Sequence, residues 1–70
     1  DGKEDGLYFY RKIIIKSKEF LENSGKIFFE IGYDQSKEVE ELFKENNYTN
    51  IYTKKDFGDN DRIVVGKKGE

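Results

Sequence analysis

The sequence predicts a small α/β fold with its elements in the order helix, strand, helix, strand, strand. Three observations support it. A segment with helical spacing precedes a short run that is apolar on both faces, and a narrower helical segment follows. Two β-prone runs then flank a polar loop near the C-terminus. Because a strand, a helix and a strand in succession imply parallel strands joined by a right-handed crossover, we expect a mixed three-stranded sheet with two helices.

The first helix is predicted at about residues 7–22. Asp5 is the expected N-cap, and Gly25 is expected to supply the left-handed residue after the helix. Three consecutive isoleucines would also suit a strand, but the length of the periodic segment and its end signals favour a helix. The buried stripe is expected to contain Tyr10, Ile13, Ile14, Ser17 and Leu21, widened by Phe9 and Phe20.

A strand at about residues 26–33 and a helix at about residues 37–46 come next. The strand does not alternate and is apolar on both faces apart from Glu30, which is typical of a central strand covered on both sides. Asp34 or Ser36 is expected to cap the helix. Its narrow apolar stripe is Val39, Leu42 and Phe43, and Asn46-Asn47 ends it, since Asn tolerates the left-handed conformation.

The C-terminal part is predicted to be a hairpin, with strands at about residues 50–57 and 62–66. The loop Gly58-Asp59-Asn60-Asp61 has suitable turn residues. The apolar run Ile63-Val64-Val65 favours a central position, so we expect the last strand to lie between the two parallel ones and antiparallel to them. Both helices should then cover one face of the sheet, leaving the other bare. On this basis we expect residues 1–70 to be a fragment of a larger domain.

Composition restricts the function classes. The chain has 13 basic and 15 acidic residues, and its net charge of −2 disfavours a dedicated nucleic-acid binder. The chain contains no Cys, His, Met or Pro. The absence of Cys excludes disulfides and thiolate ligands, and the absence of His excludes imidazole ligands. No apolar run approaches the roughly 18 residues of a membrane span. We expect a cytoplasmic protein that binds neither a membrane nor a metal, and whose bare sheet face causes weak self-association.

Glu30 and Asp5 are the two candidate contacts to a substrate. Glu30 lies near the carboxyl end of an apolar strand, where open α/β sheets place their ligands. The more ordinary interpretation is an ion pair between Glu30 and Arg62 or a lysine. Asp5, together with Gly6, opens the first helix and would line the same crevice, although capping is its default role.

Three other clusters are weaker candidates. Asp56, Asp59, Asn60 and Asp61 resemble a calcium loop, but Ile63 stands where the next ligand should be. A second cluster mixes aromatic and basic side chains: Tyr48, Tyr52, Lys54 and Lys55. Such a mixture would suit binding of single-stranded nucleic acid, although an edge strand explains it equally well. Gly66-Lys67-Lys68-Gly69 is not a phosphate loop, because no helix follows it. We therefore assign no catalytic, cofactor-binding or metal-binding residue.

Three blocks resemble the last third of bacterial release factor glutamine methyltransferases, in the order and spacing of that family. They are Asp5-Gly6-Leu7-Tyr8-Phe9-Tyr10-Arg11, Glu30-Ile31-Gly32-Tyr33-Asp34-Gln35, and Lys55-Asp56 with Asn60-Asp61-Arg62-Ile63-Val64-Val65-Gly66. The resemblance covers essentially the whole chain, although none of the blocks is a catalytic motif.

The resemblance implies a Rossmann-like fold whose last three strands are present here. It also implies a parent enzyme that uses S-adenosylmethionine to methylate the glutamine of the Gly-Gly-Gln motif in peptide chain release factors. The family's Gly-rich cofactor turn and Asn-Pro-Pro-Tyr motif are not in this sequence, so the chain alone should bind no cofactor and be inactive. Two alternatives stay open: a methyltransferase acting on the amino groups of nucleic-acid bases, and a free-standing interaction module.

Overall fold

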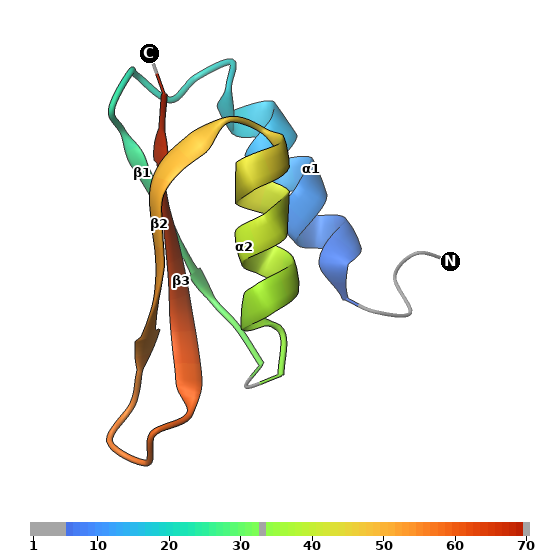
Figure 1. Ribbon diagram of the computed structural model, residues 1–70. Coiled ribbons are helices and arrows are strands. Elements are labelled where there is room, and N and C mark those ends of the chain that lie inside the picture. The colour runs from blue at the N-terminus through green and yellow to red at the C-terminus, as the bar shows by residue number, and fades with distance from the viewer. Residues whose placement is uncertain (1–5, 33, 70) are drawn as a thin grey trace.

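A computed structural model describes residues 6–32 and 34–69. The chain folds in the predicted order of two helices and three strands, which form one helical layer against one sheet (Figure 1). The elements are α1 (Leu7–Ser17), β1 (Lys26–Glu30), α2 (Ser36–Glu45), β2 (Tyr48–Lys55) and β3 (Asp61–Lys68). In the part of the chain that the structure describes, no helix is long and apolar enough to cross a membrane.

The sheet has the strand order β1-β3-β2, with β3 in the centre. Both β1 and β2 pair antiparallel with β3, so they run in the same direction without touching each other. The central position of β3 agrees with its apolar sequence. The expected mixed sheet was wrong in one respect. The inserted β3 separates the two parallel strands, so both ladders formed by the described residues are antiparallel.

The core lies between the sheet and the two helices, which cover the same face (Figure 1). Its fully buried centre combines Ile14 of α1, Val39 and Phe43 of α2, and Val64 of β3. Gly66 of β3 lets the Phe43 ring approach the strand, since a Cβ atom at position 66 would lie 2.4 Å from Cδ1 of that ring. A single helical layer therefore stabilises the whole sheet from one side.

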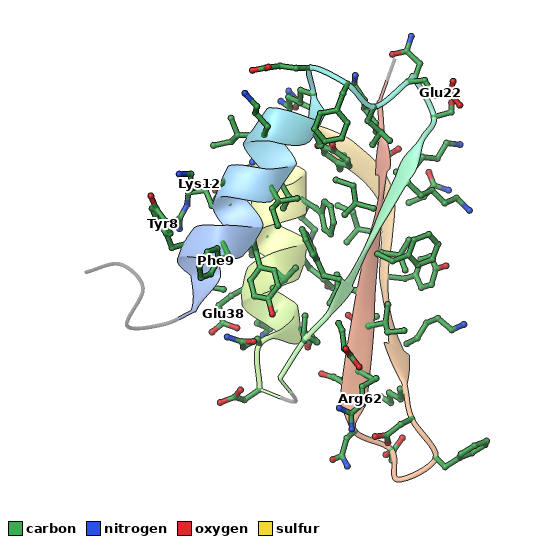
Figure 2. All side chains as sticks on the ribbon, turned by 180° about the vertical axis from the view of Figure 1, so that it is seen from behind. Tyr8, Phe9, Lys12, Glu22, Glu38 and Arg62 are labelled. Carbon is green, nitrogen blue, oxygen red and sulfur yellow. The ribbon has the colours of Figure 1, made fainter. Side chains whose placement is uncertain are left out.

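Among residues 6–32 and 34–69, no helix lies over the opposite face of the sheet (Figure 2). Phe28 and Tyr52 flank Val65 there, because both are its direct cross-strand partners. The two rings cover Val65, which is 1% exposed, but are themselves 60% and 44% exposed. The prediction that β1 is central and covered on both sides was therefore wrong for this chain: β1 is an edge strand with one bare face.

The first helix is shorter than the sequence predicted. α1 ends at Ser17, and the segment that follows forms turns rather than a continued helix. The left-handed residue is Ser24, with φ 70°, and not Gly25. The Lys68 ammonium group binds the carbonyl oxygens of Lys18 and Leu21 at 3.0 and 2.5 Å. This lysine from β3 thus satisfies carbonyl groups that a longer helix would have paired internally.

The expected helix caps also differ from the structure. Gly6, with φ 73°, occupies the N-cap of α1, and Asp5 lies outside the described residues. Gln35 is the N-cap of α2, while the Ser36 hydroxyl donates a hydrogen bond to Asp61 at 2.5 Å. At the other end of α2, Asn47 has φ 66°, as the sequence predicted.

The boundaries of β2 and β3 differ from those that the sequence predicted. β2 ends at Lys55, since the next residue, Asp56, uses its carboxylate to build the turn. β3 extends to Lys68 because Lys67 pairs with β1 and Lys68 pairs with Tyr48 of β2. Asn50, with φ 49°, lies at an irregularity in the pairing of β2 with β3. Extra residues at such a bulge increase the local twist of the strand.

Candidate functional site: the carboxyl end of β1

The carboxyl end of β1 meets the N-terminal ends of both helices, and we call this meeting point the strand-end cluster. It consists of Tyr10, the Glu30 backbone, Gly32 and Gln35. The Tyr10 hydroxyl lies 3.3 Å from both the Glu30 carbonyl oxygen and Oε1 of Gln35. The Gly32 N–H donates to the same Oε1 at 3.1 Å. One glutamine amide therefore links α1, the loop after β1 and α2.

Gly6 closes the cluster on the side of α1. Its φ of 73° favours glycine, and a Cβ atom at this position would lie 2.9 Å from Nε2 of Gln35. Close approach of the backbone to Gln35 thus explains the glycine that precedes α1. The neighbouring candidate Asp5 lies outside the described residues, so its contact to a substrate stays a prediction.

The Glu30 side chain faces the bare side of the sheet, while only its backbone takes part in the strand-end cluster. The carboxylate is exposed, and it lies in one cross-strand row with Ile63 and Lys54. Among the described residues it has no ion-pair partner. The expected pair with Arg62 was wrong, because Arg62 binds Asp56 at 2.9 Å instead. The contact of Glu30 to a substrate remains a prediction.

The acidic cluster of the β2–β3 hairpin is occupied by internal partners. One carboxylate oxygen of Asp56 accepts the backbone N–H groups of Gly58 and Asn60 at 2.8 and 3.0 Å, and the other accepts Arg62. The Asp61 carboxylate accepts the Lys55 ammonium group at 2.7 Å and the Ser36 hydroxyl. These oxygens stabilise a turn. No group of three or more metal-ligating side chains occurs among the described residues.

The same hydrogen bonds shift three pKa values. The backbone N–H of Asn60 and the Arg62 guanidinium hold the pKa of Asp56 below its ordinary value of 3.8. Lys55, followed by the Ser36 hydroxyl, lowers the pKa of Asp61, and Asp61 in turn raises that of Lys55. All three groups stay charged near neutral pH, so none of the three is prepared for proton transfer.

The aromatic and basic residues of β2 do not form a platform for nucleic acid. Tyr48 is buried against the helices, and its hydroxyl forms a short hydrogen bond with the Ser17 hydroxyl. Tyr52 lies on the opposite, bare face, and Lys55 is paired with Asp61. Since the two rings point to different sides of the sheet, they cannot stack on successive bases.

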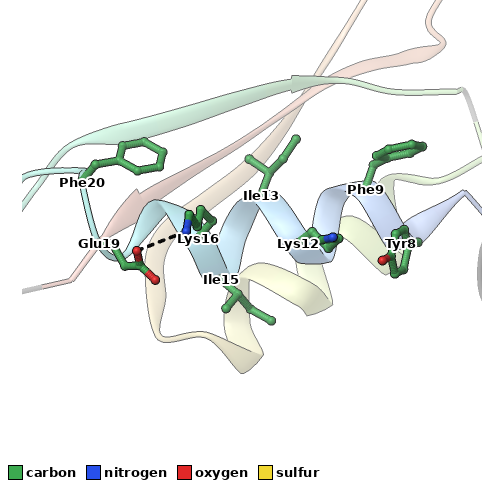
Figure 3. A pocket seen from close by; sticks show the side chains of 8 residues that line it. All are labelled: Tyr8, Phe9, Lys12, Ile13, Ile15, Lys16, Glu19 and Phe20. Atoms are coloured by element: carbon green, nitrogen blue, oxygen red, sulfur yellow. Dashed lines mark ion pairs between the residues drawn. The ribbon is translucent and has the colours of Figure 1, made fainter.

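An apolar groove runs along the outer surface of α1, away from the sheet (Figure 3). Phe9, Ile13 and Phe20, expected in the buried stripe, are exposed there. Tyr8, Phe9 and Lys12 point outward from the helix (Figure 2). The helix packs on the sheet through a narrower face, Ile14 and Ser17, because α2 already fills the neighbouring space. This groove therefore adds a second uncovered apolar surface to the bare face of the sheet.

The described residues do not fit the cofactor that the resemblance implies. The one turn from a strand into a helix, after β1, contains a single described glycine, Gly32, whose N–H is bound by Gln35. A cradle for a nucleotide-like cofactor needs free backbone N–H groups on a Gly-rich turn. The hydroxyls of Ser17 and Ser36 are also engaged, with Ile14 and Asp61 respectively. The Gly32 N–H and these two hydroxyl groups are thus engaged within the chain.

Comparison with known proteins supplies the decisive observation. The chain is 43% identical over 68 residues to the release factor glutamine methyltransferase of Clostridium acetobutylicum. The chain matches release factor glutamine methyltransferases over nearly its whole length. The enzyme named so in Thermodesulfovibrio yellowstonii is 41% identical over 70 residues, and the one in Fusobacterium nucleatum 42% over 64 residues. No family model matches the chain, and no solved structure matches it.

These release factor glutamine methyltransferases are much longer than the chain. The alignments cover 97%, 100% and 91% of the chain but only 24%, 25% and 18% of the three relatives, in the order named above. The chain therefore spans about a quarter or less of the curated relatives it matches. The three sequence blocks that resemble this family lie in the regions described above. Tyr10 belongs to the first block, and Glu30, Gly32 and Gln35 of the strand-end cluster belong to the second. The third block lies in the β2–β3 hairpin and in β3.

Sequence reasoning missed the role of Gln35 and misassigned that of Tyr10. Tyr10 was expected only as part of a buried apolar stripe, whereas its hydroxyl links α1 to β1 and α2. Gln35 follows Asp34 at the start of a helix, and a long amide side chain at that position was the available signal. The packing of the two helices against the sheet decides which backbone group the Gln35 amide reaches.

Proposed function

We propose that this chain is the C-terminal section of an enzyme that methylates the glutamine side-chain amide of the Gly-Gly-Gln motif in peptide chain release factors. S-adenosylmethionine would be the methyl donor. The observation that carries the proposal is the identity of 41–43% over nearly the whole chain with part of three enzymes named for this activity. The uncovered apolar surfaces on the sheet and on α1 support a section that packs against further protein.

In this proposal the section has a structural role in the activity. It completes the sheet with three strands, and the strand-end cluster fixes the loop after β1 at the edge where α/β sheets place their ligands. The groups that bind the cofactor and the target amide belong to the remaining three quarters or more of the enzyme. Since the rate of transfer depends on aligning the methyl donor with the amide nitrogen, residues 1–70 alone should be inactive.

The experiment compares residues 1–70 with the complete gene product that contains them. Each protein is incubated with S-adenosylmethionine labelled in its methyl group and a bacterial release factor, and transfer is followed by mass spectrometry of the Gly-Gly-Gln peptide. We expect methylation by the complete gene product only. A release factor with Gln→Asn in that motif is the control, since it should accept no label.

Three outcomes would reject the proposal. A complete gene product that methylates bases in DNA or RNA but not the release factor would place the chain in a different methyltransferase. Methyl transfer by residues 1–70 alone would show that the section is not merely structural. A gene product without transferase activity towards either substrate would instead favour an independent interaction module.

A further inference from the structure

The β2–β3 hairpin presents Phe57 at its tip, and this side chain is fully exposed to solvent. The hairpin projects beyond the helical layer, so no other described element approaches the tip (Figure 1). Burial of a phenylalanine side chain contributes about 1.5–3 kcal/mol in proteins, and Phe57 contributes none of this to the fold of residues 6–32 and 34–69. Its ring is therefore available to a partner.

The turn that carries Phe57 is held in one conformation. The Asp56 carboxylate binds the N–H groups of Gly58 and Asn60, and the Asp56 N–H donates to the Asn60 carbonyl oxygen at 2.9 Å. Arg62 clamps the same carboxylate from β3. A side chain between such fixed neighbours loses little conformational entropy when it is buried by a partner.

The tip also lies at the functional edge of the sheet. β1 and β2 run in the same direction, so their carboxyl ends, marked by Glu30 and Lys54 on either side of Ile63, share one edge. The hydrogen bond from Ser36 to Asp61 ties the start of α2 to the base of the hairpin. Phe57 thus projects past the edge that holds the strand-end cluster, where open α/β sheets bind their ligands.

The chemistry of the tip favours a protein partner. A convex turn cannot enclose a small ligand, whose sites are concave. The charged groups next to the ring are paired with each other, Arg62 with Asp56 and Lys55 with Asp61, so the tip offers no free basic cluster for nucleic-acid phosphates among the described residues. A rigid aromatic anchor suits an apolar pocket on a protein surface with a neutral or basic rim.

We propose that Phe57 is an anchor that inserts into an apolar pocket of the release factor and so determines affinity for this protein substrate. The inference rests on the proposed function, because the release factor enters through it. Phe57 takes no part in the transfer itself, and its contribution is made when the two proteins bind.

The test uses the complete gene product with a bacterial release factor and S-adenosylmethionine. Phe57→Ala is expected to raise the KM for the release factor on the order of tenfold, the effect typical of an aromatic hot spot. The kcat at saturating release factor and the KM for S-adenosylmethionine should stay unchanged. Phe57→Tyr keeps the ring and should stay within about threefold of the wild-type KM.

Phe20→Ala is the matched control. Phe20 is also exposed, but it lies beside the end of β3 that carries Lys68, at the opposite end of the sheet from the hairpin. Its truncation should leave the KM for the release factor unchanged and act only on the melting temperature, because the proposed function packs the α1 groove against the rest of the enzyme. Calorimetric titration of each variant with the release factor, without cofactor, gives the same comparison independently of catalysis.

The outcomes separate this inference from the proposed function. If the wild type is active and Phe57→Ala changes neither the KM for the release factor nor its binding, the anchor is overturned and the proposed function stays intact. A variant with a lowered melting temperature but an unchanged KM would mean that the ring packs inside the complete protein, which also overturns it. A wild type that neither methylates nor binds a release factor contradicts the proposed function, and the anchor with it.

Discussion

Replacement of Gly66 by alanine tests the packing of the core most directly. A Cβ atom at position 66 would lie 2.4, 2.6 and 2.7 Å from three carbon atoms of the Phe43 ring. That is about 1 Å inside the ordinary 3.5–4.0 Å contact between carbon atoms. The ring cannot retreat freely, because it is fully buried and packs against Phe29 and Tyr48 at centroid distances of 5.6 and 5.1 Å.

The expected cost follows from two opposing effects. Overpacking of a core destabilises proteins by roughly 1–3 kcal/mol, whereas alanine in place of glycine within a strand recovers about 0.5–1 kcal/mol. We expect Gly66→Ala to lower the free energy of unfolding by about 1–2 kcal/mol. With a urea m-value of about 1 kcal/mol/M, the midpoint of unfolding should fall by about 1–2 M.

Urea unfolding of residues 1–70, followed by far-ultraviolet circular dichroism, measures this shift. Gly58→Ala is the matched control, since its Cβ atom would meet Asn60 and Asp56 only at 3.4 and 3.5 Å and should change the midpoint little. Phe43→Leu in the Gly66→Ala background should relieve the clash, so the double variant should be more stable than the two single costs predict. Equal midpoints for Gly66→Ala and Gly58→Ala would refute the reasoning.

Other consequences concern the buried hydroxyl pair, the hairpin and the bare face of the sheet. Tyr48→Phe removes the hydrogen bond to Ser17 and should lower stability by about 0.5–1.5 kcal/mol, measured by urea unfolding. Because the folded pKa of Asp61 is depressed, its contribution to stability is present above the ordinary value of 3.8 and is lost as the pH falls through the folded pKa. Asp61→Asn should therefore flatten the fall of the unfolding midpoint below about pH 4–5; an unchanged acid limb would contradict the assignment. Phe28→Ser with Tyr52→Ser should abolish the concentration dependence of sedimentation that we expect from the bare face, and a wild type that stays monomeric at high concentration would exclude such self-association.

The element order could be predicted because each segment carries its own local signal. The apolar stripe Val39, Leu42 and Phe43 specifies α2, and the polar hairpin loop specifies the turn between the last two strands. Asn47 ends α2 in the left-handed conformation that its side chain tolerates. The central place of β3 followed from its run of apolar residues, which suits a strand with neighbours on both sides.

The candidate site was less accessible to sequence reasoning. Glu30 was located correctly at the end of a strand, but its partner was not, because Asp56 competes for Arg62 from within the same hairpin. The role of Gln35 depends on the positions of Tyr10 and Gly32, which come together only when α1 and α2 pack side by side. Contacts between elements far apart in sequence have no local signature.

The sequence by itself determined the order of the elements, the insertion of β3 and the similarity to part of a methyltransferase, because these depend on local periodicity, turn residues and motif spacing. The tertiary structure alone decided where α1 ends, which of its apolar residues are buried, and which groups Lys68, Arg62 and Gln35 bind. The physical reason is competition: two helices share one face of the sheet, and α2 takes the space that the full stripe of α1 would need. Three apolar side chains of α1 and the segment after it therefore stay exposed to solvent: Phe9, Ile13 and Phe20. Phe28 and Tyr52 are exposed on the opposite face of the sheet.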